Sequence, residues 1–130
     1  MTQPTVWPAL RYDDAPAAIR FLVDVFGFRE ALVVPDERGD IRHAELRWPE
    51  GGAVMLGSTK RTESVHAEMK AGVTSVYVVT DDVDGVYARV RRAGFELAED
   101  LHDTDFGSHT FTTRDPEGNQ WTFGTYRGAP

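Results

Sequence analysis

The chain repeats itself once, at a spacing of about half its length. Residues 47–52 read Arg-Trp-Pro-Glu-Gly-Gly, and residues 114–119 read Arg-Asp-Pro-Glu-Gly-Asn, 67 positions later. A glycine follows each segment in step, at Gly57 and Gly124. Such a repeat means that one supersecondary unit occurs twice, and that two copies too small to fold alone bury their apolar faces together. The sequence therefore predicts two tandem modules that share a core.

Each module is predicted to contain one amphipathic helix. Aspartate pairs at 13–14 and 81–82 precede the two helices and offer N-caps, and Gly27 and Gly94 follow where a left-handed C-terminal cap belongs. Between these signals, apolar residues recur at helical spacing, which indicates one buried face on each helix. These apolar residues are Ile19, Leu22, Val23 and Phe26 in the first helix and Val83, Val86, Tyr87 and Val90 in the second.

Alternating apolar residues, separated by turns rich in glycine, proline and aspartate, predict four strands in each module. The expected strands are 6–12, 29–35, 40–48 and 53–58, then 73–80, 96–102, 108–114 and 119–126. The sequence thus predicts an α+β fold of two tandem βαβββ modules, residues 1–60 and 73–130, joined by a linker at 61–72.

Strand alternation assigns side chains to the two faces of each sheet. In the third strand, Ala44 and Leu46 are expected to face the helix, which leaves His43, Glu45 and Arg47 on the opposite side. In the last strand, Trp121 and Phe123 are expected under the helix, with Gln120, Thr122 and Tyr126 opposite. One face of each sheet is therefore predicted to be core and the other partly polar.

Composition excludes several classes of function. The chain has a formal net charge of -7 and scattered rather than clustered basic residues, which argues against nucleic acid as a partner and favours a neutral or cationic ligand. The absence of cysteine excludes disulfides, thiolate metal sites and cysteine nucleophiles. The sequence has neither a signal-peptide pattern nor a membrane-spanning apolar run, so we expect a cytoplasmic protein without a membrane partner.

The repeat, with its Asp-Pro-Glu-Gly-Asn turn at 115–119 and the first-helix segment at 18–28, resembles the vicinal oxygen chelate superfamily. This superfamily includes glyoxalase I, extradiol dioxygenases and bleomycin resistance proteins. The resemblance covers nearly the whole chain. It implies eight strands that form a cup-shaped mixed sheet, with the helices outside. It also implies a homodimer, because paired modules, often from two chains, complete each cup.

The resemblance also locates the positions where metal-dependent relatives carry their ligands. Counting from the aspartate pairs and the Pro-Glu-Gly turns, these positions are Trp7, Met55, Ser75 and Thr122. Zinc, nickel or iron sites require imidazole and carboxylate ligands, which none of these residues supplies. A register slip of one residue does not introduce any. We therefore expect no metal and no other cofactor, although His43 and Glu45 together could form half of a site.

A cup without a metal favours binding over catalysis. Trp7, Tyr77 and Tyr126 are predicted to line it together with Met55, Ser75 and Thr122, and Arg47 and His109 complete the predicted ligand-binding set. Aromatic walls with few polar anchors are typical of small-molecule pockets. The leading hypothesis is that the protein sequesters a hydrophobic or aromatic drug or natural product, as bleomycin resistance proteins do in antibiotic resistance.

Catalysis is the alternative. His43 and Glu45, with Arg47 beside them, could act as general base, orienting acid and oxyanion clamp in an isomerisation next to a carbonyl group. A glyoxalase-like lyase or dioxygenase that uses a metal is a further alternative, although the four missing ligands argue against it. Residues 59–72 could serve as a linker that allows module exchange between subunits or as a lid over the cup.

Overall fold

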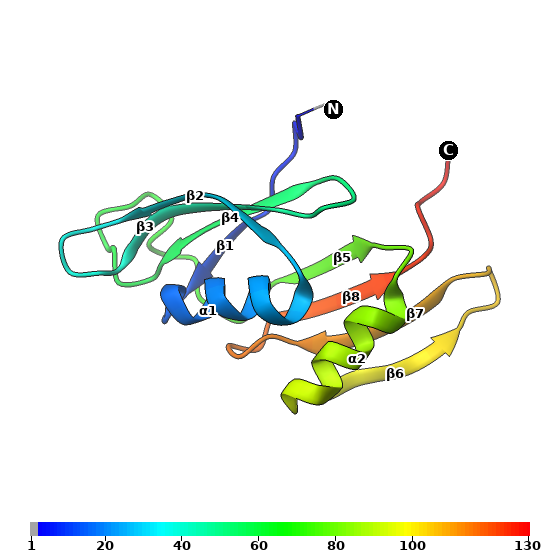
Figure 1. The fold of residues 1–130 in the computed structure, drawn as a ribbon. Helices are drawn as coiled ribbons and strands as arrows, with labels where there is room; N and C mark the ends of the chain where they lie inside the picture. The colour runs from blue at the N-terminus through cyan, green and yellow to red at the C-terminus, as the bar shows by residue number, and fades with distance from the viewer. Residues whose placement is uncertain (1–2) are drawn as a thin grey trace.

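The computed structural model describes residues 3–130 and confirms the α+β architecture (Figure 1). Each module contains four strands and one helical segment, which in the first module is an α-helix continued by a π-helix, η1. The first module comprises β1 (Ala9–Tyr12), α1 (Ala15–Phe21), η1 (Leu22–Phe26), β2 (Arg29–Pro35), β3 (Ile41–Arg47) and β4 (Ala53–Ser58). The second comprises β5 (Ser75–Val79), α2 (Val83–Ala93), β6 (Leu97–Asp103), β7 (His109–Arg114) and β8 (Gln120–Gly124).

The eight strands form two sheets with the same topology. Their strand orders are β1-β4-β3-β2 and β5-β8-β7-β6. In each sheet the first strand pairs in parallel with the last strand of its module, and the other neighbours are antiparallel. Figure 1 shows α1 against the first sheet and α2 against the second. The duplication seen in the sequence is therefore a duplication of topology.

The helices begin and end as predicted. The Asp14 side chain accepts a hydrogen bond from the Ala17 amide, and Asp82 caps α2 in the same way. Gly27 and Gly94 end the helical segments with left-handed backbone, at φ 101° and 82°. The last turn of the first helical segment differs from expectation, because it is the π-helix η1. The capping pattern locates this end but does not distinguish a π-turn from an α-turn.

Three strands are each three residues shorter than predicted, and β3 and β7 are shorter by two residues and by one. β1 begins at Ala9 rather than at residue 6, because Pro8 has no amide hydrogen, although its carbonyl accepts from the Met55 amide at 2.9 Å. Trp7 therefore precedes β1. β5 begins at Ser75 rather than at residue 73, and β8 ends at Gly124 rather than at residue 126, so Tyr126 follows the strand.

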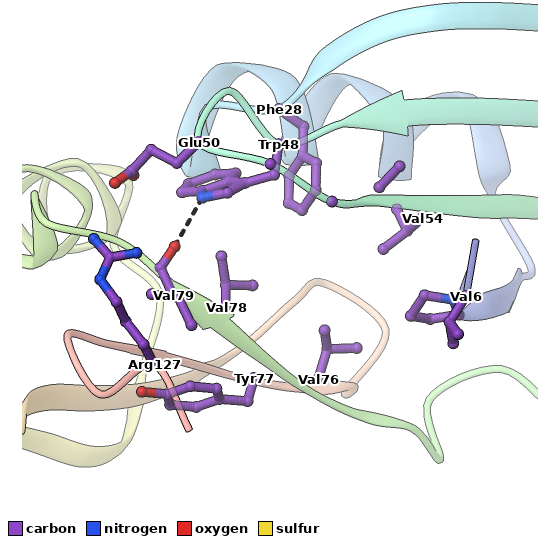
Figure 2. Close-up of a pocket in the computed structure, with 14 residues that line it drawn as sticks. Val6, Phe28, Trp48, Glu50, Val54, Val76, Tyr77, Val78, Val79 and Arg127 are labelled. Carbon is purple, nitrogen blue, oxygen red and sulfur yellow. Dashed lines mark hydrogen bonds between the residues drawn. The ribbon is translucent and has the colours of Figure 1, made fainter. Parts of the chain in front are cut away.

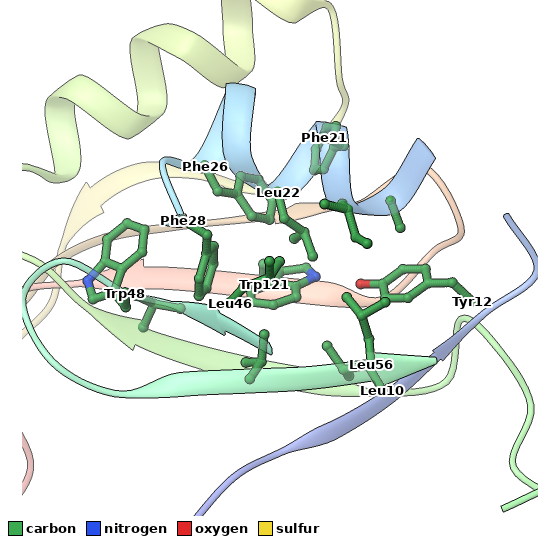
Figure 3. Packing of buried hydrophobic residues seen from close by; sticks show 14 of the residues in the cluster. Leu10, Tyr12, Phe21, Leu22, Phe26, Phe28, Leu46, Trp48, Leu56 and Trp121 are labelled. Atoms are coloured by element: carbon green, nitrogen blue, oxygen red, sulfur yellow. The ribbon is translucent and has the colours of Figure 1, made fainter. Parts of the chain in front are cut away.

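The helix-facing sides of both sheets meet in one core, as the repeat predicts. Ala44 and Leu46 on β3 and Trp121 and Phe123 on β8 are completely buried, which confirms the predicted faces. Phe26, at the end of η1, packs on both Trp121 and Phe123, with ring centroids 5.3 and 4.8 Å apart. Figure 3 shows Phe26 and Trp121 of this cluster between the elements of the two modules.

The repeated turns join the modules reciprocally. Glu117, in the β7–β8 turn, accepts hydrogen bonds from the Asp13 and Asp14 amides at 2.6 and 2.8 Å. Its equivalent Glu50, in the β3–β4 turn, accepts from the Asp81 amide at 2.9 Å and from the Thr80 hydroxyl at 2.5 Å. Each module thus binds the segment just before the helix of the other.

One buried carboxylate has no equivalent in the first module. Asp115 is only 4% exposed and accepts hydrogen bonds from the Tyr12 hydroxyl at 2.6 Å, the Trp121 indole at 3.0 Å and the Asn119 side chain at 3.0 Å. Burial, reinforced by the Asp115 charge, raises the pKa of Tyr12, which keeps its hydroxyl protonated as a donor. The equivalent position holds Trp48, whose indole donates to the Val79 carbonyl at 3.0 Å.

No helix within residues 3–130 is long and apolar enough to cross a membrane.

Candidate functional site

The sides of the two sheets that face away from the helices are called here the outer faces. On the first sheet, the outer face carries charged groups and a thioether: Arg11, His43, Glu45, Arg47 and Met55. On the second sheet, it carries mainly hydroxyl groups: Ser75, Tyr77, Thr112 and Thr122. Most of the predicted site residues therefore lie on outer faces, but they divide between two sheets.

His43 and Glu45 come together on β3, as the alternative hypothesis requires. The His43 Nε2 and a Glu45 carboxylate oxygen are 2.8 Å apart, and the two side chains are 38% and 30% exposed. Met55 is the register partner of Glu45 on β4. The arrangement provides an imidazole in contact with a carboxylate at a surface that a ligand can reach.

A pocket of about 300 Å³ lies between the first outer face and the connection between the modules. His43 and Met55 line it from the sheet, and Ser64, His66 and Met69 line it from the connection. Segment 59–72 therefore forms one wall of a pocket. The Arg61 side chain fixes it to the β2–β3 turn through an ion pair with Asp36 at 3.1 Å.

Arg11 lies in this pocket and is absent from the predicted set. Its Nη2 donates to the Ser58 carbonyl at 2.9 Å, whereas its buried Nε has no hydrogen-bond partner among residues 3–130. The signal was present in the sequence, because Arg11 alternates with the core residues Leu10 and Tyr12 and must therefore face outward.

Trp7 and Arg47 form a second small group beside the first sheet. The Arg47 guanidinium lies 6.0 Å from the centre of the Trp7 ring, at the outer limit of a cation–π contact. Arg47 also donates to the Gln3 side chain, and the Trp7 indole donates to the Pro4 carbonyl at 3.1 Å. The structure brings these two predicted residues together, but it leaves them outside the pocket that contains His43.

The second outer face holds the predicted aromatic residues. Tyr77 is 45% exposed and donates to the Tyr126 carbonyl at 2.6 Å. The Thr112 and Thr122 hydroxyls are hydrogen-bonded at 2.7 Å. Tyr126 packs edge-on against Phe106, with centroids 5.3 Å apart. The aromatic side chains are exposed, whereas Thr112 is buried at 8%.

A cleft of about 380 Å³ lies where the modules meet along β5 (Figure 2). Its walls are mainly apolar and come from both modules. In Figure 2, Val76 and Val78 of β5 lie on one side, with Phe28, Trp48 and Val54 on the other. Tyr77 is the one predicted site residue that lines it.

His109 lies apart from the other predicted residues. It shares a face of β7 with the buried Phe111, and its ring is held by Asp84 of α2 at 2.7 Å and by Asp103 of β6 at 2.6 Å. The hydrogen bond to Asp84, followed by that to Asp103, raises the pKa of His109. The structure therefore places His109 on the helix side, where it connects α2 to the β6–β7 hairpin. The strand alternation with Phe111 already indicated this face.

The four positions where a metal-dependent relative carries its ligands do not fit a hard divalent ion. They hold the indole of Trp7, the thioether of Met55 and the hydroxyls of Ser75 and Thr122. Within residues 3–130, moreover, no three histidine, aspartate or glutamate side chains gather in a geometry that could hold a metal. Among these described residues, none stands beside His43 and Glu45 as a third ligand.

Comparison with solved structures places this geometry among known proteins. The structure is similar to TioX from Micromonospora sp. ML1, with a TM-score of 0.80, 34% identity and coverage of 95% of this chain and 98% of TioX. TnmS3, an antibiotic binding protein from Streptomyces sp. CB03234, has the same fold, with a TM-score of 0.72, 22% identity and coverage of 95% and 96%. So does a lactoylglutathione lyase from Agrobacterium tumefaciens, with a TM-score of 0.68, 24% identity and 93% coverage of both chains.

The family assignment comes from the sequence as well as from the fold. Residues 5–123 match the Glyoxalase/Bleomycin resistance protein/Dioxygenase superfamily, so the match spans both modules. The duplicated βαβββ topology, the two four-stranded sheets and the outer faces opposite the helices agree with that match. The chain belongs to the Glyoxalase/Bleomycin resistance protein/Dioxygenase superfamily.

Proposed function

We propose that this protein binds a small hydrophobic or aromatic molecule, of the drug or natural-product class, without a metal, and acts by sequestering it in the cytoplasm. Its relatives by fold include TnmS3, an antibiotic binding protein. A role in antibiotic resistance would follow from sequestration of an antibiotic. The fold alone does not distinguish binding from catalysis, because the lactoylglutathione lyase shares it.

The observation that carries the proposal is the chemistry of the four ligand positions. Trp7, Met55, Ser75 and Thr122 replace a set of potential metal ligands with side chains suited to an organic molecule. Lewis-acid stabilisation of an enediolate, or activation of dioxygen, requires a metal that these side chains do not bind well. An indole, a thioether and hydroxyls instead offer an apolar surface with a few hydrogen-bonding groups.

A homodimer would complete the site. In one chain the core lies on the helix sides of the sheets, so side chains on the other side remain partly exposed, with Tyr77 at 45% and Tyr126, just after β8, at 42%. We propose that the first outer face of one copy lies opposite the second outer face of its partner. The ligand would then lie between the His43 and Met55 side and the Tyr77 and Thr122 side. Light scattering after size exclusion tests this, and a monomer at micromolar concentration contradicts it.

A thermal-shift screen tests the proposed function directly. Protein purified without a histidine tag is heated with aromatic natural products and, separately, with nickel, zinc and iron. A ligand that binds only the native state raises the unfolding midpoint. We expect an aromatic compound to raise it and to quench the Trp7 fluorescence, and Trp7→Ala to weaken that binding. Stoichiometric metal in the purified protein, or unchanged affinity in Trp7→Ala, contradicts the proposal.

An acid–base enzyme is the second candidate, and the 2.8 Å contact between His43 and Glu45 favours it. In this reading His43 accepts a proton next to a substrate carbonyl and Glu45 orients the imidazole. Arg47 lies outside the pocket that contains His43, so it would stabilise the oxyanion only of a substrate that extends along the outer face. His43→Ala and Glu45→Gln then abolish turnover while Trp7→Ala mainly weakens binding. If both variants retain full turnover of a compound that the wild type converts, this role is excluded.

A further inference from the structure

We propose that the pocket beside β1 is an anion subsite in which Arg11 binds the carboxylate of a small aromatic acid. The inference rests on the proposed function, since it specifies the class of organic ligand. It departs from the neutral or cationic ligand that the net charge of -7 suggests. The charge of the ligand is inferred from the residues that line the pocket rather than from the net charge of the whole chain.

Arg11 has an unused donor at this pocket. The Nη2 atom donates to the Ser58 carbonyl at 2.9 Å, which fixes the guanidinium. The Nε atom is buried, and no group within residues 3–130 accepts its hydrogen. A buried donor without an acceptor costs free energy, and an arginine cannot avoid that cost by losing its proton. Because Nε is buried, a ligand oxygen supplies the missing acceptor only after the groups that cover this atom move aside.

The side chains that line the pocket are basic, neutral or apolar. Arg11, Arg42, His43 and His66 line it, and no aspartate or glutamate does. This is unusual in a chain with 21 acidic and 14 basic residues. The same outer face carries the Glu45 carboxylate, which is engaged by His43 at 2.8 Å. Within the described chain, Arg11 has no ion-pair partner, so its charge remains available to a ligand.

The rest of the pocket indicates the body of the ligand. Met55 from β4 and Met69 from the connection contribute thioethers, and sulfur makes favourable contacts with aromatic rings. The volume of about 300 Å³ is at the lower end of the range for small-molecule sites. A planar carboxylate matches the arginine fork, whereas an isolated phosphate would leave the thioethers without an apolar partner. The geometry therefore points to an aromatic carboxylic acid.

The first experiment uses the wild-type protein and two probes of nearly equal shape. Isothermal titration calorimetry compares 2-naphthoate with the neutral 2-naphthamide. Loss of a charge-assisted hydrogen bond predicts that the amide binds about tenfold more weakly or worse. Equal affinities overturn the inference. Inorganic phosphate is then added as a competitor, and displacement of naphthoate by equimolar phosphate shows a general anion site and overturns the carboxylate assignment.

The second experiment assigns the preference to Arg11. Arg11→Gln is expected to remove the difference between acid and amide, while Arg11→Lys retains part of it. Arg92→Gln, which changes an exposed arginine on α2, is the matched control and is expected to leave both affinities unchanged. A preference that survives in folded Arg11→Gln overturns the assignment. If that variant does not fold, Arg11→Lys decides it, and a preference as large as that of the wild type overturns the assignment.

The two proposals fail differently. If neither naphthalene probe binds but neutral aromatic compounds raise the unfolding midpoint, the anion subsite is wrong and the sequestration function stands. If no aromatic compound binds, whether charged or neutral, both proposals are wrong.

Discussion

At equivalent positions the two modules differ on their outer faces but agree at the ends of their helices. Met55 in β4 corresponds to Thr122 in β8, 67 positions later, and Ala9 in β1 corresponds to Tyr77 in β5, 68 positions later. By contrast, both helices have an aspartate N-cap and end at a glycine with left-handed backbone. What the modules share is what builds the fold.

The difference assigns separate tasks to the two outer faces. The first offers Arg11, His43 and Glu45, which can recognise charge or move a proton. The second offers Tyr77 and Thr122, which provide an aromatic surface and neutral hydrogen bonds. A ligand bound between one copy of each face would meet a charged side and a neutral side. The variants below test whether residues of the shared scaffold and residues of the two outer faces can be changed independently of each other.

The largest expected effect comes from the scaffold, at Asp115. Asp115→Ala removes the carboxylate that accepts from Tyr12, Trp121 and Asn119, all of which are buried. Each buried donor that is left without a hydrogen-bond acceptor costs about 1–3 kcal/mol. We therefore expect the free energy of unfolding to fall by about 3 kcal/mol or more. Urea denaturation measures the change, and both outer faces should lose binding together.

The matched control for this variant is Asp105→Ala, which changes an exposed aspartate in the β6–β7 turn. It is expected to alter stability by less than about 0.5 kcal/mol. A loss below about 1 kcal/mol in Asp115→Ala would show that the buried carboxylate contributes little beyond what its donors can obtain elsewhere.

The second prediction separates the outer faces at a repeated glycine. A Cβ at Gly124 would lie 2.6 Å from the Tyr77 hydroxyl oxygen, so Gly124→Ala must displace that side chain from the Tyr126 carbonyl. We expect a loss of about 1–2 kcal/mol in stability, since overpacking costs this much. A crystal structure of the variant should show Tyr77 moved and the pocket beside Arg11 unchanged.

Gly57, the equivalent position in the first module, supplies the control. A Cβ there would lie 3.2 Å from the Arg42 carbonyl oxygen, and its three nearest atoms all belong to the backbone. Gly57→Ala should therefore leave the Tyr77 side chain in place. If Tyr77 keeps its hydrogen bond in Gly124→Ala as well, the second outer face is more adaptable than the close contact implies.

The repeat allowed the scaffold to be predicted from the sequence in detail. Strand alternation correctly assigned Ala44, Leu46, Trp121 and Phe123 to the helix-facing sides of their sheets, because a shift of one residue would expose all four. The strand ends were less accurate. Pro8 lacks the amide hydrogen that the first strand would need for pairing, and the alternation of apolar residues does not reveal this.

The site was harder to predict because it depends on a segment without periodicity. Ser64, His66 and Met69 line the pocket from the connection between the modules. The sequence of this connection predicts turns, but it does not predict which part of the molecule the connection packs against. Arg11 was missed for the same reason: alternation shows that it faces outward, and only the connection makes that position part of a pocket. His109 was predicted as a ligand-binding residue although its alternation with Phe111 indicates the helix side.

A smaller effect is expected at the reciprocal caps between the modules. Glu117→Ala removes the acceptor for two backbone amides, and Glu50→Ala removes the acceptor for one amide and one hydroxyl. A lost cap costs about 1 kcal/mol, so we expect Glu117→Ala to cost about that much and Glu50→Ala somewhat less. Urea denaturation of both variants beside Glu37→Ala, in an exposed turn, measures the difference. If Glu50→Ala lowers the free energy of unfolding as much as Asp115→Ala does, the glutamate caps stabilise the protein as strongly as the buried carboxylate.

The smallest effect is a pH dependence at His109. Its hydrogen bonds to Asp84 and Asp103 raise its pKa in the folded state, so the protonated ring stabilises the fold. This contribution is fully present below the unfolded pKa of about 6.5 and is lost as the pH rises through the folded pKa. Both aspartates are largely exposed, so the contribution should stay below about 1 kcal/mol.

The variant that isolates this contribution is His109→Gln, compared with His102→Gln on the neighbouring β6. Urea denaturation at about pH 5.5 should find wild type more stable than His109→Gln, and at about pH 9 the difference should shrink, because the imidazole is then neutral. His102→Gln is the control, because it removes a histidine whose ring contacts the Asp100 carbonyl instead of Asp84 and Asp103. A difference that grows with pH would mean that neutral His109 makes the stronger contacts. Because His109 lies on the helix side, ligand binding at either outer face should be the same in His109→Gln as in wild type, and a weaker affinity in that variant would return His109 to the ligand-binding set.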